Sequence, residues 1–224
     1  MPTVSSVDVG ELLAGVDSAF AETGALTPGW PNPHPDDVRP AEEEYSRESD
    51  PAKYRILGAR VQAWSRALVA TGLATPDAPD DQRPRWRGPL TTALPMLETV
   101  CLRPARAGAV PLLLVTREEV DGLATVVSVG AGDPAHEVDL VPDCSCDACD
   151  LGSDDLLEAL DDRVLDVVSG ALVHVLTPEG YVQRRRDGGG VRSGGRTPVD
   201  YDQVLADVEA GRSSYPVVRG ESWW

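Results

Sequence analysis

The fold is decided by residues 97–141, which read LETVCLRPARAGAVPLLLVTREEVDGLATVVSVGAGDPAHEVDLV. Short runs rich in valine, leucine and threonine alternate here with residues that favour turns, and this pattern is typical of strands. We predict four strands, at Leu97–Arg103, Val110–Thr116, Ala124–Val129 and His136–Val141. The dipeptide Asp121-Gly122 supplies a turn between the second strand and the third. Because these connections are too short to hold crossover helices, the strands should pair as antiparallel neighbours.

Two further strands and four helices are expected around this stretch. Ala171–Leu176 is apolar on both faces, as in a central strand, and a short strand should follow near Tyr181–Arg184. The first three predicted helices carry an apolar stripe, and all four have a residue suited to cap the first turn. The helices, with their expected caps, are 5–23 (Ser5), 51–72 (Asp50), 154–169 (Ser153) and 198–210 (Thr197). Their stripes need a common surface to cover, so the sequence predicts a single α+β domain over residues 1–224. Its sheet should be antiparallel or mixed, with about five strands, and two to four helices should pack on it.

Two segments should lack regular structure. A proline-rich loop is expected near 25–40, because four prolines fall within residues 28–35. A Gly/Arg-rich segment at 187–196 is expected to be a mobile loop. An overlapping run, residues 190–197, resembles a phosphate-binding loop with arginine in the place of lysine, but the apolar strand that such a loop requires does not precede it. We therefore expect no nucleotide binding there.

The charge balance limits the possible partners. The 224 residues include 37 acidic and 20 basic side chains, for a formal net charge of −17. Such a chain is repelled by nucleic acid and by anionic membranes. No apolar run approaches the ~20 residues of a transmembrane helix, and the first ten residues do not have the basic and apolar regions of a secretory signal. These features predict a cytoplasmic protein whose cysteines are thiols or metal ligands rather than disulfides.

The most specific motif is the cysteine cluster at residues 143–150, which reads DCSCDACD. Cys144, Cys146 and Cys149 have a C-x-C-x-x-C spacing, which lets three thiolates on a turning loop converge on one soft cation such as zinc. Two alternatives stay open. The cysteines could pack as small apolar groups, or the last two could form a redox-active pair.

A zinc ion at this cluster needs a fourth ligand. Cys101 is the best candidate, because a strand neighbouring 136–141 could aim its thiol at the cluster. His136 and a carboxylate such as that of Asp147 are the other candidates. The predicted metal ligands are therefore Cys144, Cys146, Cys149 and Cys101.

The remaining polar features point to binding rather than to catalysis. Residues 143–162 hold eight acids and no base, which suits either a basic partner or the dipole of the helix that begins there. No established catalytic motif is present, and His174 should be a core residue because it lies in an apolar strand. Trp223 and Trp224 should form a docked tail. The first interpretation is thus an acidic cytoplasmic binding protein without catalytic activity, with a basic protein as partner. The alternative is a zinc-binding or thiol-redox protein that uses the three clustered cysteines.

Three segments carry a resemblance to a known family. They are Glu44-Tyr45-Ser46-Arg47, the run CSCDACD with GSDDLL after it at residues 144–157, and Ser222-Trp223-Trp224. This pattern resembles a family of uncharacterised proteins, a domain of unknown function, from high-GC Gram-positive bacteria. The resemblance spans the chain from the proline-rich loop to the C-terminus. It implies a bacterial cytoplasmic setting and one domain, and it transfers no catalytic role.

Overall fold

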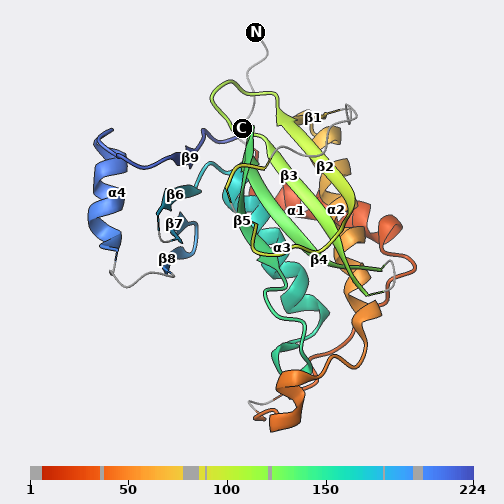
Figure 1. The fold of residues 1–224 in the computed structure, drawn as a ribbon. Coiled ribbons are helices and arrows are strands. Elements are labelled where there is room, and N and C mark those ends of the chain that lie inside the picture. The colour runs from red at the N-terminus through yellow and green to blue at the C-terminus, as the bar shows by residue number, and fades with distance from the viewer. Residues whose placement is uncertain are drawn as a thin grey trace.

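In the described part of the chain, two antiparallel sheets and four α-helices make up a single α+β domain in the computed structural model (Figure 1). The structure describes residues 7–35, 38–77, 86–88, 90–120, 123–178, 180–193 and 199–224. The larger sheet has the strand order β1-β2-β3-β4-β5, and the smaller one has the order β8-β7-β6-β9. Among the described helices, none has both the length and the apolar character that crossing a bilayer requires.

The five-stranded sheet confirms the four strands predicted from the central stretch. Its strands are β1 Ala74–Pro76, β2 Met96–Pro104, β3 Leu112–Val120, β4 Leu123–Gly132 and β5 Ala135–Val141. All of them pair with antiparallel neighbours, for example Leu114 with Val129. The expected turn Asp121-Gly122 lies outside the described residues, and β1 was not predicted. The pairing of β5 with β4 shifts by one residue between Val129 and Gly130, so this edge strand carries a bulge.

Three helices pack on one face of this sheet and lie behind it in Figure 1. They are α1 Val9–Thr23, α2 Ile56–Ala70 and α3 Ser153–Val168. Apolar residues at helical spacing meet the apolar side chains of the strands, and Trp64, Leu114 and Val164 are fully buried between the layers. This face therefore forms the main core.

The first two helices begin differently from the prediction. Ser5 lies outside the described residues, and the carboxylate of Asp8 caps α1 by accepting from the backbone N–H groups of Gly10 and Glu11 at 2.7 and 3.3 Å. The expected helix at 51–72 begins with a 3₁₀ turn, η3 Pro51–Arg55, and the Asp50 side chain accepts no capping hydrogen bond. The proline favours a helical first turn, but the α-helical pattern starts five residues later.

The caps of the last two helices were also predicted wrongly. Gly152, with φ +96°, occupies the N-cap position of α3, while the Ser153 hydroxyl contacts Trp30. Helix α4 spans Tyr201–Glu209, and the Asp200 carboxylate caps it by accepting from Gln203 N at 3.0 Å. The expected cap Thr197 lies outside the described residues.

A second sheet departs from the predicted single sheet. Its strands are β6 Val173–Thr177, β7 Gly180–Arg185, β8 Gly188–Ser193 and β9 Val217–Arg219. The apolar strand β6 is internal, as predicted, but its neighbours are β7 and β9. Residues 188–193 form a strand in place of the expected irregular loop, because they pair with β7 as a hairpin. Helix α4 packs on this sheet through Leu205 and Val208.

The C-terminal segment returns to the main core. Trp223 is 1% exposed, its backbone N–H donates to Val168 O at 2.9 Å, and its indole N–H donates to Val110 O at 3.2 Å. The predicted docked tail is therefore confirmed at Trp223.

Candidate functional site

The three clustered cysteines lie on the loop 142–152, which connects β5 to α3 and includes the 3₁₀ turn η4 Asp147–Cys149. Their sulfur atoms all lie within 4.8 Å of one another. Cys144 and Cys149 are exposed, and Cys146 is half-buried. The structure thus brings together three of the four predicted metal ligands.

Asp147 fixes the outer part of this loop. Its carboxylate accepts hydrogen bonds from Ser49 Oγ and Arg47 Nε, both at 2.6 Å, and from Ser49 N at 2.9 Å. Its own backbone N–H donates to Arg47 O at 2.8 Å. These hydrogen bonds, from Ser49 first and then from Arg47, hold the pKa of Asp147 well below its usual range. The carboxylate proposed as a metal ligand therefore anchors the loop to the segment after η2 Glu42–Ser46.

Asp150 fixes the inner part of the loop. Its carboxylate accepts from Trp30 Nε1 at 2.9 Å, from Lys53 Nζ at 2.5 Å and from Gly152 N at 2.9 Å. Burial opposes ionisation of this carboxyl, but the hydrogen bonds from Lys53 and Trp30 outweigh it, so the pKa of Asp150 is lowered. Asp150 is thus a buried carboxylate paired with a half-buried ammonium.

Two aromatic rings surround that ammonium. Lys53 Nζ lies 5.3 Å from the centroid of the Trp30 ring and 5.2 Å from that of the Tyr54 ring, and the two rings meet edge to face. The Tyr54 hydroxyl donates to Ser145 O at 3.2 Å, inside the cysteine loop. Burial raises the pKa of Tyr54, so this phenol stays protonated and keeps its donor.

The proline-rich loop supports the site from the other side. Trp30 exchanges hydrogen bonds with Ser153, since Trp30 N donates to Ser153 Oγ and Ser153 N donates to Trp30 O, both at 3.0 Å. A Cβ atom at Gly152 would lie 2.7 Å from Asn32 N, and the positive φ of Gly152 also favours glycine. Close backbone contact therefore fixes the junction between the cysteine loop and α3.

The thiols interact with one another. Burial opposes ionisation of Cys146, but hydrogen bonds from the thiols of Cys144 and Cys149 outweigh it and lower the pKa of Cys146. The hydrogen bond to Cys146, together with burial, raises the pKa of Cys149 to about 12. The cluster thus favours a thiolate at Cys146 over one at Cys149, and a cation would be needed to hold three thiolates together.

The other predicted ligands do not reach the cluster. Cys101 lies on β2, which is separated from β5 by β3 and β4, so the expectation of a strand next to 136–141 was wrong. Its sulfur lies 3.8 Å from Asp77 Oδ2. His136 is buried at the opposite end of β5 from the cysteine loop, with its ring 6.4 Å from that of His174.

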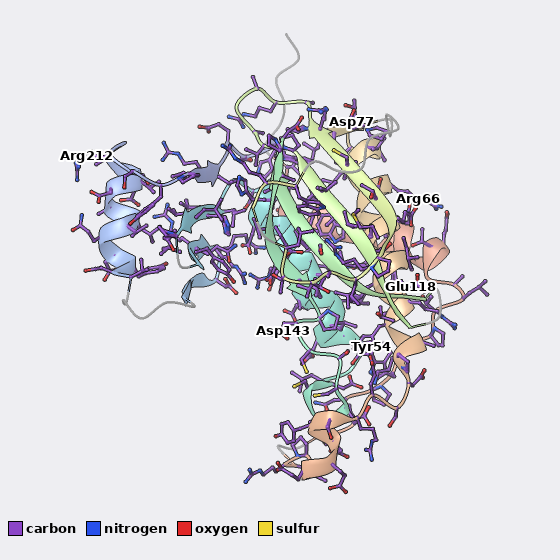
Figure 2. All side chains as sticks on the ribbon, viewed as in Figure 1. Tyr54, Arg66, Asp77, Glu118, Asp143 and Arg212 are labelled. Carbon is purple, nitrogen blue, oxygen red and sulfur yellow. The ribbon has the colours of Figure 1, made fainter. Side chains whose placement is uncertain are left out.

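Two pockets flank the cysteine loop. The first has a volume of about 350 Å³, and its lining includes Cys144 and Cys149. The second has a volume of about 330 Å³, and its lining includes Cys144 and Cys146. Asp143 lines both of them, and Figure 2 shows it near Tyr54, with sulfur atoms of the loop just below. The cysteines therefore form part of the wall between two hollows.

Sequence reasoning missed the residues that hold the loop in place. These are Trp30, Arg47, Ser49, Lys53 and Tyr54. Two signals pointed to this region: the segment ending in Arg47 belonged to the family resemblance, and Lys53 is the only lysine in the chain. Neither signal specifies that both residues bind aspartates of the cysteine loop.

No curated protein and no solved structure shows significant similarity to the chain. A family model described as "Family of unknown function (DUF6226)" matches residues 16–224. This range includes Trp30, the anchoring segment 47–54, the cysteine loop and both sheets. The chain therefore belongs to the DUF6226 family.

Proposed function

We propose that Cys144, Cys146 and Cys149 bind one soft metal ion, with zinc as the expected metal. The observation that carries this proposal is the mutual distance of the three sulfurs, all within 4.8 Å on an anchored loop. Two sulfurs that bind one zinc ion at ~2.3 Å in tetrahedral geometry lie roughly 3.8 Å apart. Small movements of side chains therefore suffice to place all three around one ion.

The alternatives explain the arrangement less well. Cysteines that only pack as apolar groups should be buried against Leu151 and Leu156, but two of the three thiols are exposed and Leu151 is 53% exposed. A disulfide uses two sulfurs and leaves the third without a role. A metal ion uses all three, and it also removes the repulsion between neighbouring thiolates.

Elemental analysis of protein purified without chelator or affinity tag tests this proposal. We expect about one zinc ion per chain, lost in Cys146→Ser and retained in the matched control Cys101→Ser, whose thiol lies three strands away. A chelator should lower the melting temperature of the wild type but not that of Cys146→Ser, since metal binding contributes to folding free energy. The proposal is contradicted if the wild-type protein contains no metal and its melting temperature does not change with chelators.

We also propose binding of a basic partner, on the strength of four acids near the cysteine loop. Of the eight acids in residues 143–162, Asp147, Asp150, Asp161 and Asp162 pair with described cationic side chains. The other four are exposed and have no such ion pair within the described part of the chain: Asp143, Asp154, Asp155 and Glu158. These four carboxylates, rather than the whole acidic segment, form the candidate surface.

A further inference from the structure

The proposed metal site has three protein ligands and no fourth within the described residues. The carboxylates of Asp147 and Asp150 are held by cations and hydrogen-bond donors, and Cys101 and His136 lie elsewhere. No described carboxylate or imidazole joins the three sulfurs within the distances of a ligand set. Structural zinc sites have four protein ligands, whereas a site with three leaves a position for an outside ligand.

The larger pocket is suited to supply that ligand. Its volume of about 350 Å³ lies within the range of roughly 300–1,000 Å³ that is typical of small-molecule sites. Cys144 and Cys149 contribute to its wall, so an ion bound by the cluster borders the pocket. The rest of the wall includes the apolar side chains of Leu140, Pro142 and Leu156, and the ion-paired side chains of Asp139, Arg163 and Arg185.

Charge indicates which ligand the pocket prefers. Asp143 and Asp155 line it, both are exposed, and no described residue forms an ion pair or hydrogen bond with either carboxylate. A divalent ion with three thiolates adds a net charge of about −1. The lining cations Arg163 and Arg185 both pair with Asp139. The carboxylates of Asp143 and Asp155 and the metal–thiolate group therefore repel an anionic ligand and attract an ammonium group. Thiolate-bound soft metals in turn prefer sulfur as a further ligand.

We infer that this pocket binds a small aminothiol, with its sulfur at the open metal position and its ammonium group beside Asp143 and Asp155. This inference rests on the proposed metal site. Binding forms one metal–sulfur bond and replaces a metal-bound water, and the thiol proton passes to the solvent. No atom changes its oxidation state. The apolar wall covers the short carbon chain between the two ends of the ligand.

Cobalt-substituted protein provides the test, with cysteamine as the probe. Cysteamine should raise the intensity of the sulfur-to-cobalt charge-transfer band by about a third, because four sulfur ligands replace three. Mercaptoacetate, an anionic thiol of similar size, should bind about tenfold more weakly, and this preference should shrink in Asp155→Asn. Ala159→Trp fills the pocket and should abolish the response while cobalt still binds. The matched control Thr92→Trp fills the second pocket and should leave the response intact.

Different results of these experiments contradict different parts of the inference. Wild-type protein that binds neither cobalt nor zinc contradicts the metal site itself. If the protein binds cobalt but its spectrum does not change with cysteamine, the metal-site proposal is unaffected and the aminothiol inference is overturned. A spectrum that changes in Asp143→Asn before any thiol is added also overturns it, because Asp143 is then the fourth ligand. Equal affinities for cysteamine and mercaptoacetate overturn the assignment of the ligand class.

Discussion

At the scale of single residues, Lys53 has the most specific environment in the site. Of the 20 basic residues it alone is lysine, and its ammonium contacts the buried Asp150 between the rings of Trp30 and Tyr54. A compact ammonium fits between two rings and one carboxylate, whereas the planar guanidinium of arginine needs more space and a different geometry. Arginine is common elsewhere in this chain, so lysine at this position follows from the local geometry.

Replacing Lys53 should therefore weaken the fold through Asp150. Lys53→Met leaves a buried carboxylate without its cation, and we expect the free energy of unfolding to fall by about 3 kcal/mol, with a smaller loss in Lys53→Arg. Urea denaturation measures both changes. Arg66→Met is the control, because Arg66 and Glu22 form an exposed ion pair whose loss should cost under about 1 kcal/mol. Equal effects of Lys53→Met and Arg66→Met would show that the Asp150 contact does not stabilise the fold.

The residues of the site divide into those that spacing predicts and those that it cannot predict. The proximity of the three thiols follows from C-x-C-x-x-C on a short loop. The anchors do not follow, because Arg47 is 100 residues from Asp147, and Trp30 is 120 residues from Asp150. Contacts over such separations depend on how α2 and α3 pack on the sheet, and no local pattern encodes that packing.

At the scale of elements, the contact between the two sheets depends on buried polar groups. His174 on β6 is fully buried, its ring lies 5.1 Å from that of Tyr181, and its Nδ1 lies 3.1 Å from Gln183 Nε2. The same amide donates to Val138 O on β5 at 2.8 Å. His174 Nε2 has no hydrogen-bond partner in the described structure, so the expected core histidine is only partly satisfied.

This contact should make stability depend on pH. Burial, with smaller contributions from His136 and Arg185, lowers the pKa of His174 from 6.5 to about 4. Between pH 6.5 and pH 4, His174 is protonated in the unfolded chain but neutral in the folded protein. The free energy of unfolding therefore falls as the pH decreases. The loss should reach roughly 3 kcal/mol near pH 4. Urea denaturation from pH 7 to pH 4 measures it.

His174→Gln isolates this effect from the titration of carboxylates in the same range. The glutamine variant is less stable at neutral pH, because it loses the packing of the ring. Its free energy of unfolding should nevertheless fall less steeply than that of the wild type between pH 6.5 and pH 4. Parallel pH profiles of the two proteins would show that His174 does not stay neutral in the folded state.

The predicted sheet of about five strands is confirmed, and it ends at the outer edge of β5. The β-bulge interrupts that strand, and the Gln183 side chain, rather than a backbone N–H, contacts Val138 O. The next strand, β6, therefore pairs with β7 and β9 instead of extending the first sheet. Strand patterns specify which residues alternate, but the choice of neighbour depends on such edge contacts.

At the scale of the whole molecule, the net charge of −17 conceals an uneven distribution. Several acids form ion pairs with cationic side chains of the protein. In contrast, Asp154, Asp155 and Glu158 line one exposed side of α3 near its N-terminus. The formal charge follows from the composition, and the α+β class follows from the strand and helix patterns of the sequence. Which acids face the solvent follows only from the structure, because it depends on where the arginines lie.

A basic partner should therefore bind through these three carboxylates together with that of Asp143. We expect an oligolysine peptide to associate with the protein, with an affinity that decreases as salt increases, because surface attraction is screened. Replacing Asp154, Asp155 and Glu158 with their amides should slow association several-fold, which stopped-flow fluorescence measures. Asp162→Asn is the control, since Asp162 already pairs with Arg186. Tight binding of duplex DNA by the wild type contradicts this expectation.

The docking of Trp223 also determines when the fold can be completed during synthesis. Trp223 fills a space between α3 and the connection from β2 to β3, and β9 supplies the second neighbour of β6. A nascent chain that ends after α4 contains β6 and the residues that surround Trp223, but it contains neither β9 nor Trp223 itself. The smaller sheet lacks β9, and the core beside α3 lacks Trp223, until the segment 217–223 has left the ribosome. The domain therefore reaches its final packing only after that segment has emerged.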